Sequence, residues 1–240
     1  MKVLVIGSGG REHAIVEALS RSPRKPKIYA APGNAGIAAL AECVAIKDTE
    51  ADKLLAFAQE NDIELTVVGP EAALAVGVVD KFRAAGLKIF GPTKAATEIE
   101  SSKDFAKRLM KKYDVPTADY ATFSDFDEAL AYVRKGSLPT VLKYDGLAAG
   151  KGVVIATTME EAEATLRDML LDTKFGEGRV VIEEFLTGEE FSLMCFVAGN
   201  KICPMPVNGV PSATIASATR CIMFVIAYSW SSADTNGNSV

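Results

Sequence analysis

Two lysines and a cluster of glycines between residues 140 and 156 are the residues whose types and spacing most directly indicate chemistry. The segment reads TVLKYDGLAAGKGVVIA: an apolar run that ends at Lys143, a glycine-rich loop that carries Lys151, and a second apolar run. The second run is β-branched and continuously apolar, which favours a returning strand over a helix. The segment therefore predicts a hairpin flap whose lysines and glycine amides close over an anion.

The loop of this hairpin differs from a P-loop in spacing and in context. A P-loop has four residues between its glycines and a Ser or Thr after its lysine. Here three residues separate Gly146 from Gly150, and Gly152 follows Lys151. A P-loop also leads into a helix whose N-terminal amides face the phosphates, whereas a strand is expected here. The residues alone leave two interpretations open, an anion-binding flap and an ordinary hairpin with a flexible turn.

The start of the chain predicts the first strand and helix of a doubly wound parallel sheet. Residues 2–6 are an apolar strand pattern, and the following GSGGREHA opens a helical pattern. A dinucleotide fingerprint needs a third glycine where Glu12 stands, and residues 27–31, the second strand, end in alanines instead of a ribose-binding acid. A nicotinamide or flavin site is therefore not expected. The helix start, with the amides of Gly9 and Gly10 facing outward, suits a small phosphate.

Further loops fall where strands of this sheet should end. Strands are expected at 43–46, from 65 and at 87–90, and helices at 49–61 and 72–86. Because ligands bind at the carboxyl ends of such strands, the glycines after the first strand, Asn34 and Glu71 are predicted to line one crevice. The alternatives are ordinary turn chemistry for Gly9, Gly10 and Asn34 and a first-turn helix charge for Glu71. His13 is interpreted as structural.

The second half of the chain predicts a small α+β unit built around the flap. SSKD at 101–104 resembles a capping box with Ser101 as N-cap, which opens a helix to Tyr113. Lys103 in its first turn opposes the helix dipole unless an anion lies nearby; the alternative is a solvated surface lysine. A strand at 119–123, helices at 124–135 and 158–171, and two strands flanking a turn at 187–188 complete the unit. Glu183 and Glu190 bracket that turn, where they either accept from a ligand or are solvated.

Composition limits the class of protein. The 240 residues are 49% hydrophobic with a formal net charge of -5, which gives no general attraction to nucleic acid or to anionic membranes. The four cysteines show no metal or disulfide spacing, and neither a signal peptide nor a membrane-spanning run is expected. A soluble cytoplasmic protein without nucleic-acid or membrane partners is expected, and oligomeric state is not predicted.

Seven motifs in a fixed order carry a family resemblance over residues 1–206. They are GSGGREHA, PGNAG, VVGPEAALA, GPT, SSKDFAK, LKYDGLAAGKGV and EEFLTGEEFS. In this order they resemble the glycinamide ribonucleotide synthetases, also called phosphoribosylamine-glycine ligases, of the ATP-grasp superfamily. The resemblance implies an ATP-dependent carbon-nitrogen ligase of purine biosynthesis. Its substrates would be glycine and 5-phosphoribosylamine, and it would use ATP with Mg²⁺ or Mn²⁺. The reaction needs no protein nucleophile, because glycine is activated as glycyl phosphate.

The resemblance also assigns residues and segments. The residues implied to bind ATP are Lys103, Lys143, Gly146, Gly150, Lys151, Gly152, Glu183, Glu184, Leu186 and Glu190. Glu183, Glu184 and Leu186 would contact adenine mainly through backbone groups, and Glu190 would hold the ribose. The residues implied on the phosphoribosylamine side are Gly9, Gly10, Arg11, Glu12, Asn34 and Glu71. The implied segments are a Rossmann-like substrate domain (1–98), a helical linker (99–118), an ATP-grasp lid (119–190), the start of the ATP-grasp core (191–206) and an atypical tail (207–240).

The tail departs from the family in composition. After Val207 only Arg220 and Asp234 carry charge, in a chain that is 24% charged, and the family's metal ligands and C-terminal domain are not recognised. We hypothesise a truncated chain whose tail arises from a shifted reading frame; the alternative is a divergent strand that completes the sheet. Little ligase activity is then expected from this chain alone. The competing interpretations are a noncatalytic ATP-binding fragment and another ATP-grasp carboxylate-amine ligase.

Overall fold

The structure, a computed structural model, describes residues 1–148, 152–172, 174–188, 195–198, 201–205 and 227–229. It divides into two compact units, of which the first is built mainly from Met1–Thr97 and the second mainly from Glu98–Phe191. Within the described residues, no helix combines the length and the apolar character needed to cross a bilayer.

A parallel sheet forms the centre of the first unit. Its strands, in spatial order, are β3 (Glu42–Cys43), β2 (Lys27–Pro32), β1 (Lys2–Gly7), β4 (Leu65–Val68) and β5 (Ile89–Phe90). Every neighbouring pair runs parallel, and the order of the strands reverses between β1 and β4. The predicted doubly wound parallel sheet is therefore confirmed.

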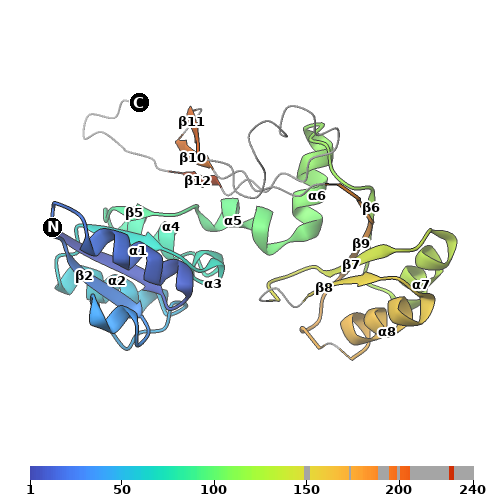
Figure 1. The fold of residues 1–240 in the computed structure, drawn as a ribbon, viewed down its shortest axis with the longest axis horizontal. Helices are drawn as coiled ribbons and strands as arrows, with labels where there is room; N and C mark the ends of the chain where they lie inside the picture. The colour runs from blue at the N-terminus through green and yellow to red at the C-terminus, as the bar shows by residue number, and fades with distance from the viewer. Residues whose placement is uncertain (149–151, 173, 189–194, 199–200, 206–226, 230–240) are drawn as a thin grey trace. The chain divides into compact units, whose positions relative to one another are not determined.

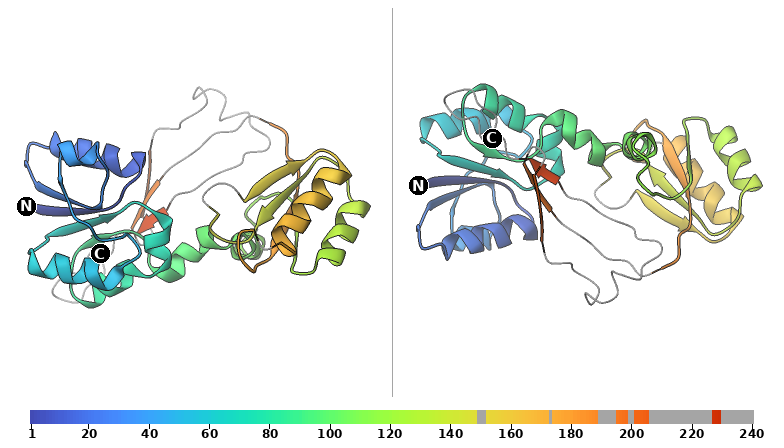
Figure 2. Two further views of the ribbon diagram at one scale, coloured as in Figure 1. Left: turned by 90° about the horizontal axis from the view of Figure 1, so that it is seen from below. Right: turned by 90° about the horizontal axis from the view of Figure 1, so that it is seen from above.

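Alternate residues of the central strands pack against helices on opposite faces of this sheet. Val3 and Val5 lie in a buried cluster with Val16 of α1 (Gly10–Ser20). Leu4 and Ile6 lie in a second cluster with residues of α2 (Ala51–Glu60) and α4 (Val78–Ala84). Figure 2 shows α1 on one side of the strands and α2 and α4 on the other. Burial on both faces explains why β1 reads as a continuous apolar run.

Three predicted elements of this unit differ from the structure. The helix expected at 72–86 is two helices, α3 (Glu71–Ala75) and α4, because Gly77 between them adopts a left-handed conformation with φ of 81°. The strand expected at 43–46 is limited to Glu42–Cys43, after the short 3-10 helix η1 (Ile37–Ala39). The strand expected at 87–90 is limited to Ile89–Phe90.

An antiparallel sheet forms the centre of the second unit. Its strands, in spatial order, are β6 (Tyr120–Phe123), β9 (Val180–Glu184), β7 (Thr140–Tyr144) and β8 (Val153–Ala156). Two helices, α7 (Phe126–Lys135) and α8 (Met159–Leu170), cover one face of it (Figure 1). The predicted hairpin is confirmed as β7 paired antiparallel with β8. The residues at its tip, 149–151, lie outside the described residues.

The two faces of this sheet have different chemistry. Leu142, Tyr144 and Ile182 belong to the apolar cluster with α7 and α8. Because side chains alternate along a strand, Lys143 and Glu183 point to the opposite face. There they meet side chains of α6 (Lys103–Lys112), which follows α5 (Lys94–Ser101). One face of the antiparallel sheet is therefore apolar, and the other carries the ion pairs of Glu183 beside the buried Val181.

The cap of α6 was predicted one residue too early. Ser101 ends α5, and the N-cap of α6 is Ser102, whose Oγ accepts a hydrogen bond of 3.1 Å from the N–H of Phe105. Ser102 Oγ also donates to Asp145 Oδ1 at 3.1 Å. A contact from a distant loop thus distinguishes two adjacent serines.

Replacing Ser102 with alanine is expected to lower the free energy of unfolding by about 1–2 kcal/mol, because both the cap and the bond to Asp145 are lost. The matched control, Ser101→Ala, is expected to change it by less than about 0.5 kcal/mol. Urea denaturation followed by circular dichroism measures both. Equal losses in the two variants would contradict the assignment of Ser102 as the cap.

Three short strands complete the described elements. They are β10 (Cys195–Ala198), β11 (Lys201–Pro204) and β12 (Ala227–Ser229), in the spatial order β11-β10-β12. β12 lies within the predicted atypical tail and pairs parallel with β10. The rest of the tail, 207–226 and 230–240, lies outside the described residues.

Candidate functional site

The helices that follow β1 and β4 are joined at their first turns by an ion pair, at the point where the strand order reverses. Arg11 follows β1, and both its Nη1 and its Nη2 donate to Glu71 Oε1 at 3.0 Å. Glu71 is the first residue of α3, directly after β4. Glu71, predicted to line the crevice, is therefore in direct contact with Arg11, which the resemblance assigns to the phosphoribosylamine side.

Glu12 fills the space between the loops that follow β1 and β4. Its side chain is 4% exposed, and its Oε2 accepts a hydrogen bond of 2.6 Å from the N–H of Gly9. A Cβ on Gly7 would lie 2.6 Å from Glu12 Cγ, and a Cβ on Gly69 would lie 2.1 Å from Glu12 Oε1. That Oε1 is buried and lies 3.5 Å from Arg11 Nε. The glutamate thus occupies the place that a third glycine leaves open in a dinucleotide-binding loop.

The position of Glu12 corrects one expectation about the amides of this loop. The N–H of Gly9 was expected to face outward towards a phosphate, but it is bonded to the Glu12 carboxylate. Beside Gly10 the backbone is open, because a Cβ there would meet no atom within 4 Å. Space for a ligand at the start of α1 therefore lies beside Gly10.

Asn34 links the loops after β1 and β2. Its Nδ2 donates to the carbonyl of Ser8 at 2.8 Å, and its Oδ1 accepts from the N–H of Ile37 at 2.9 Å. His13 packs against this loop, since a Cβ on Gly36 would lie 2.6 Å from His13 Cε1. The ends of β1, β2 and β4 thus bring together the six residues predicted on the substrate side.

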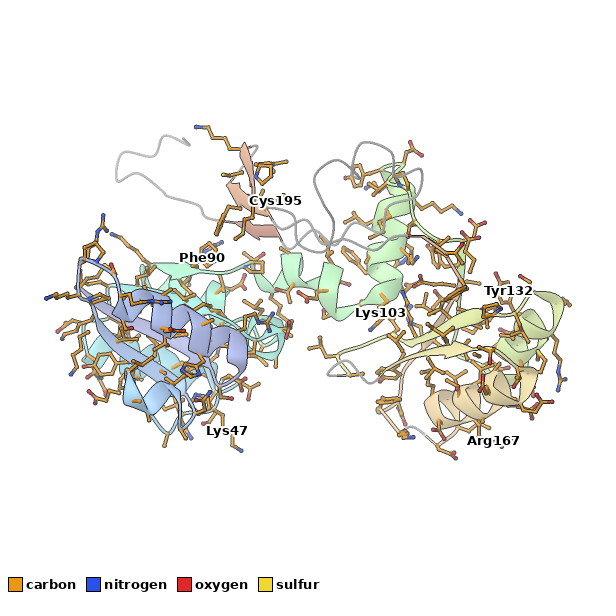
Figure 3. The ribbon with its side chains drawn as sticks, viewed as in Figure 1. Lys47, Phe90, Lys103, Tyr132, Arg167 and Cys195 are labelled. Atoms are coloured by element: carbon orange, nitrogen blue, oxygen red, sulfur yellow. The ribbon has the colours of Figure 1, made fainter. Side chains whose placement is uncertain are left out.

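Lys103 and the flap are in contact in the second unit. Lys103 Nζ donates to the carbonyl of Gly146 at 3.0 Å, and Figure 3 shows Lys103 at the start of α6. Burial lowers the pKa of Lys103 below its ordinary value; the Asp145 carboxylate counteracts this, and the nearby Lys143 ammonium adds to it. Two neighbouring ammonium groups, one of them partly desolvated, favour an anion between them.

The carboxylate of Glu183 lies between two lysines, an arrangement that the sequence reading missed. Glu183 Oε1 lies 2.9 Å from Lys143 Nζ, and Oε2 lies 2.9 Å from Lys107 Nζ. Glu183 was expected at a nucleotide site mainly through its backbone, yet its side chain is 6% exposed and paired. The sequence did offer one signal, for Lys107 alone. Lys107 lies four residues after Lys103 and therefore on the same face of the helix.

A second ionic cluster attaches the start of the flap to α6. The Asp145 side chain, 3% exposed, accepts from the backbone N–H of Asp104 at 3.1 Å and pairs with Arg179 Nη2 at 2.7 Å. Asp104 in turn pairs with Arg179 Nη1 at 3.2 Å and with Arg108 Nε at 2.9 Å. Because these contacts surround the first turn of α6, they fix the position of Lys103, the first residue of that helix. None of them was predicted.

Two of the flap glycines, Gly146 and Gly152, lie where a side chain would clash with its neighbours. A Cβ on Gly146 would lie 2.7 Å from the Tyr144 ring, and one on Gly152 would lie 2.6 Å from Ala148 Cβ. Neither Gly146 nor Gly152 has a positive φ. A Cβ on Gly178 would also lie 2.7 Å from the Tyr144 ring. The residues at the tip, Gly150 and Lys151, lie outside the described residues.

The end of β9 holds the residues expected near adenine. The N–H of Glu184 donates to the carbonyl of Asp119 at 3.0 Å, and the carbonyl of Glu183 accepts from Thr140 Oγ1 at 3.0 Å. These backbone groups therefore already have partners within the sheet. Leu186 lies just beyond the strand and is half-buried, and Glu190 lies outside the described residues.

In the part of the chain that the structure describes, no group of three or more His, Cys, Asp or Glu side chains gathers in a way that would hold a metal ion. The acidic side chains near the flap are instead paired with lysine or arginine.

Two family models match almost the whole described chain in succession. Residues 1–100 match the model described as "Phosphoribosylglycinamide synthetase, N domain". Residues 101–209 match the model described as "Phosphoribosylglycinamide synthetase, ATP-grasp (A) domain". The boundary between the two models falls within the segment predicted as a helical linker, and the limits of that segment stay a prediction.

Similar proteins carry the corresponding name. The phosphoribosylamine–glycine ligase of Halalkalibacterium halodurans is 56% identical over 207 residues, which are 85% of this chain and 48% of the relative. That of Streptococcus pneumoniae serotype 4 is 57% identical over 209 residues, 86% of this chain and 50% of the relative. The crystal structure of phosphoribosylamine–glycine ligase from Thermotoga maritima aligns with a TM-score of 0.71 at 33% identity, covering 86% of this chain and 49% of that one. The chain thus spans about half the length of the relatives it matches.

Proposed function

We propose, because the chain belongs to the phosphoribosylglycinamide synthetase family, that it carries the nucleotide side and the phosphoribosylamine side of an ATP-dependent ligase. The reaction joins glycine to 5-phosphoribosylamine and yields glycinamide ribonucleotide, ADP and phosphate. The observation that supports this most is the placement of Lys103, in contact with Gly146 at the start of the flap and electrostatically coupled to Lys143.

On the nucleotide side, Lys103 and Lys143 bind phosphates of ATP. Their charges offset the negative charge that accumulates when a glycine carboxylate oxygen attacks the γ-phosphorus and ADP leaves. The flap residues Gly146, Gly150, Lys151 and Gly152 cover these phosphates and exclude water from the glycyl phosphate. Backbone groups of Glu183, Glu184 and Leu186 border the adenine, and Glu190 holds the ribose.

On the other side, the six residues at the ends of β1, β2 and β4 bind 5-phosphoribosylamine. Arg11 supplies a cation, and the start of α1 beside Gly10 supplies backbone N–H groups for the 5-phosphate. The amine of this substrate attacks the carbonyl carbon of glycyl phosphate, and inorganic phosphate leaves with the electron pair of the broken C–O bond. The proposed location is the cytoplasm.

A divalent cation, Mg²⁺ or Mn²⁺, belongs to this proposal as a companion of ATP. Among the described residues, no three His, Cys, Asp or Glu side chains gather to hold it.

Lys143→Met is expected to weaken ADP binding by about tenfold or more, because a charge-assisted contact to a phosphate is lost. Isothermal titration calorimetry measures the affinity. The matched control is Lys135→Met, at the exposed end of α7, which is expected to leave the affinity within about twofold of the wild type. Equal affinities for wild type and Lys143→Met would remove Lys143 from the nucleotide site.

A substrate assay separates the proposed ligase from its competitors. ATP, glycine and 5-phosphoribosylamine are supplied together, and glycinamide ribonucleotide is quantified alongside ADP. Nucleotide binding without ligation under every substrate combination would favour a noncatalytic ATP-binding chain. ADP release with other carboxylates but not with glycine would favour another carboxylate-amine ligase.

A further inference from the structure

The two lysines that share the Glu183 carboxylate differ in how firmly they are held. Lys107 comes from α6, and its side chain is 9% exposed; Lys143 comes from β7, and its side chain is 28% exposed. Each pairs with a different oxygen of Glu183 at the same distance of 2.9 Å. The carboxylate therefore has one partner within the interior and one partner towards solvent.

The ammonium of Lys107 is fully bonded inside the protein. It pairs with Glu183 Oε2, donates to Thr117 Oγ1 at 2.8 Å and donates to the carbonyl of Ala118 at 3.2 Å. These contacts use all three N–H donors of an ammonium group. The Tyr120 ring lies 5.6 Å from the same nitrogen. Lys107 cannot reach a ligand without giving up these contacts.

Lys143 is placed so that its ammonium can move away from the Glu183 carboxylate. Its partner residue Glu183 lies on the neighbouring strand, offset diagonally by two residues on the same face, because Lys143 is paired directly with Val181. Its ammonium also acts on the pKa of Lys103, so the two cations lie within electrostatic range of each other. An anion bound by both would draw Lys143 away from the carboxylate.

We propose that Lys107 is the permanent countercharge of Glu183, which allows Lys143 to exchange this carboxylate for a phosphate of the nucleotide. The inference rests on the proposed nucleotide site and adds a residue that does not touch the nucleotide. With Lys107 in place, the departure of Lys143 leaves Glu183 paired. Without Lys107, the same departure would leave a buried carboxylate without a countercharge, so Lys143 would stay on Glu183. Lys107 is a positioning residue for Lys143.

A double-mutant cycle on ADP affinity tests this coupling in the full chain. Lys107→Met is expected to weaken ADP binding by about tenfold in the wild-type background. In the Lys143→Met background, the same substitution is expected to change affinity by less than about twofold, because the lysine on which it acts is absent. Isothermal titration calorimetry gives the affinities, and thermal unfolding checks that each variant is folded.

A double variant in which both buried charges are replaced by neutral side chains provides a second test of the coupling. In Lys107→Met/Glu183→Gln, no carboxylate competes for Lys143, and two neutral side chains replace the buried charges. Its ADP affinity is expected to return to within about threefold of the wild type. If Lys107→Met does not fold alone, this variant decides, and an affinity about tenfold below that of the wild type would overturn the inference.

The outcomes separate the inference from the function on which it rests. No ADP binding by the wild-type chain would overturn both. Wild-type binding that Lys107→Met leaves within about twofold would overturn the inference alone. An equal loss from Lys107→Met in both backgrounds would also overturn it, because Lys107 would then act through the fold and not through Lys143.

Discussion

Replacing Glu183 with glutamine is expected to lower the free energy of unfolding of the second unit by about 3–5 kcal/mol. The substitution leaves the buried ammonium of Lys107 without a countercharge. The amide oxygen still accepts one hydrogen bond, but it carries no charge to offset a lysine whose side chain is 9% exposed. Lys143 loses the same partner at lower cost, since solvent reaches it. Chemical denaturation followed by circular dichroism measures the change.

Glu184→Gln is the matched control for this experiment. Glu184 is the next residue of the same strand and is exposed, and its backbone contact with Asp119 does not depend on its side chain. Its substitution is expected to change the free energy of unfolding by less than about 0.5 kcal/mol. A loss below about 1 kcal/mol for Glu183→Gln would mean that the two lysines do not depend on this carboxylate.

Gly69→Ala is expected to destabilise the first unit by about 3 kcal/mol. The new Cβ would lie 2.1 Å from Glu12 Oε1 and 2.5 Å from Glu12 Cδ, so the glutamate side chain has to move. Moving it breaks the bond from the Gly9 N–H and disturbs a carboxylate that is almost fully buried. The loss is measured as a lower midpoint of urea denaturation.

Two further variants identify the cause of this loss. Gly10→Ala adds the same methyl group where no atom lies within 4 Å, at the start of α1, and is expected to leave stability unchanged or to raise it by up to about 1 kcal/mol. In the Glu12→Ala background, Gly69→Ala is expected to cost much less, because the clashing side chain is gone. Additive losses would show that the methyl group clashes with something other than Glu12.

Local patterns were sufficient for elements whose signal lies within one segment. Residues 2–6 form a strand because they are buried on both faces, and the two apolar runs around the flap form its hairpin. The helix break at Gly77 was missed, because its surroundings Ala75, Val76 and Val78 maintain a helical pattern and only the left-handed backbone reveals the turn. The α6 cap was missed for a different reason: Ser101 and Ser102 are equivalent as local signals until Asp145 contacts one of them.

Some features of the candidate site could likewise be predicted from one segment of the sequence, whereas others depend on contacts between distant segments. The absent third glycine at Glu12 was readable from the sequence, but the reason for a glutamate there depends on Gly69, which lies in another loop. The pairing of Glu183 with Lys143 depends on which strands are neighbours, and that pairing has no local signature. The ligand roles of these residues remain predictions, as do those of Gly150, Lys151 and Glu190.

The difference between the two faces of the antiparallel sheet also bears on misfolding. If β9 slipped by one residue against its neighbours, Glu183 would point among Leu142, Tyr144 and the helices, and Ile182 would face Lys107 and Lys143. A buried carboxylate without a cation on one side and two lysines without an anion on the other would both be costly. Glu183 therefore penalises mispaired strands during folding, in addition to any contribution it makes once the native pairing has formed.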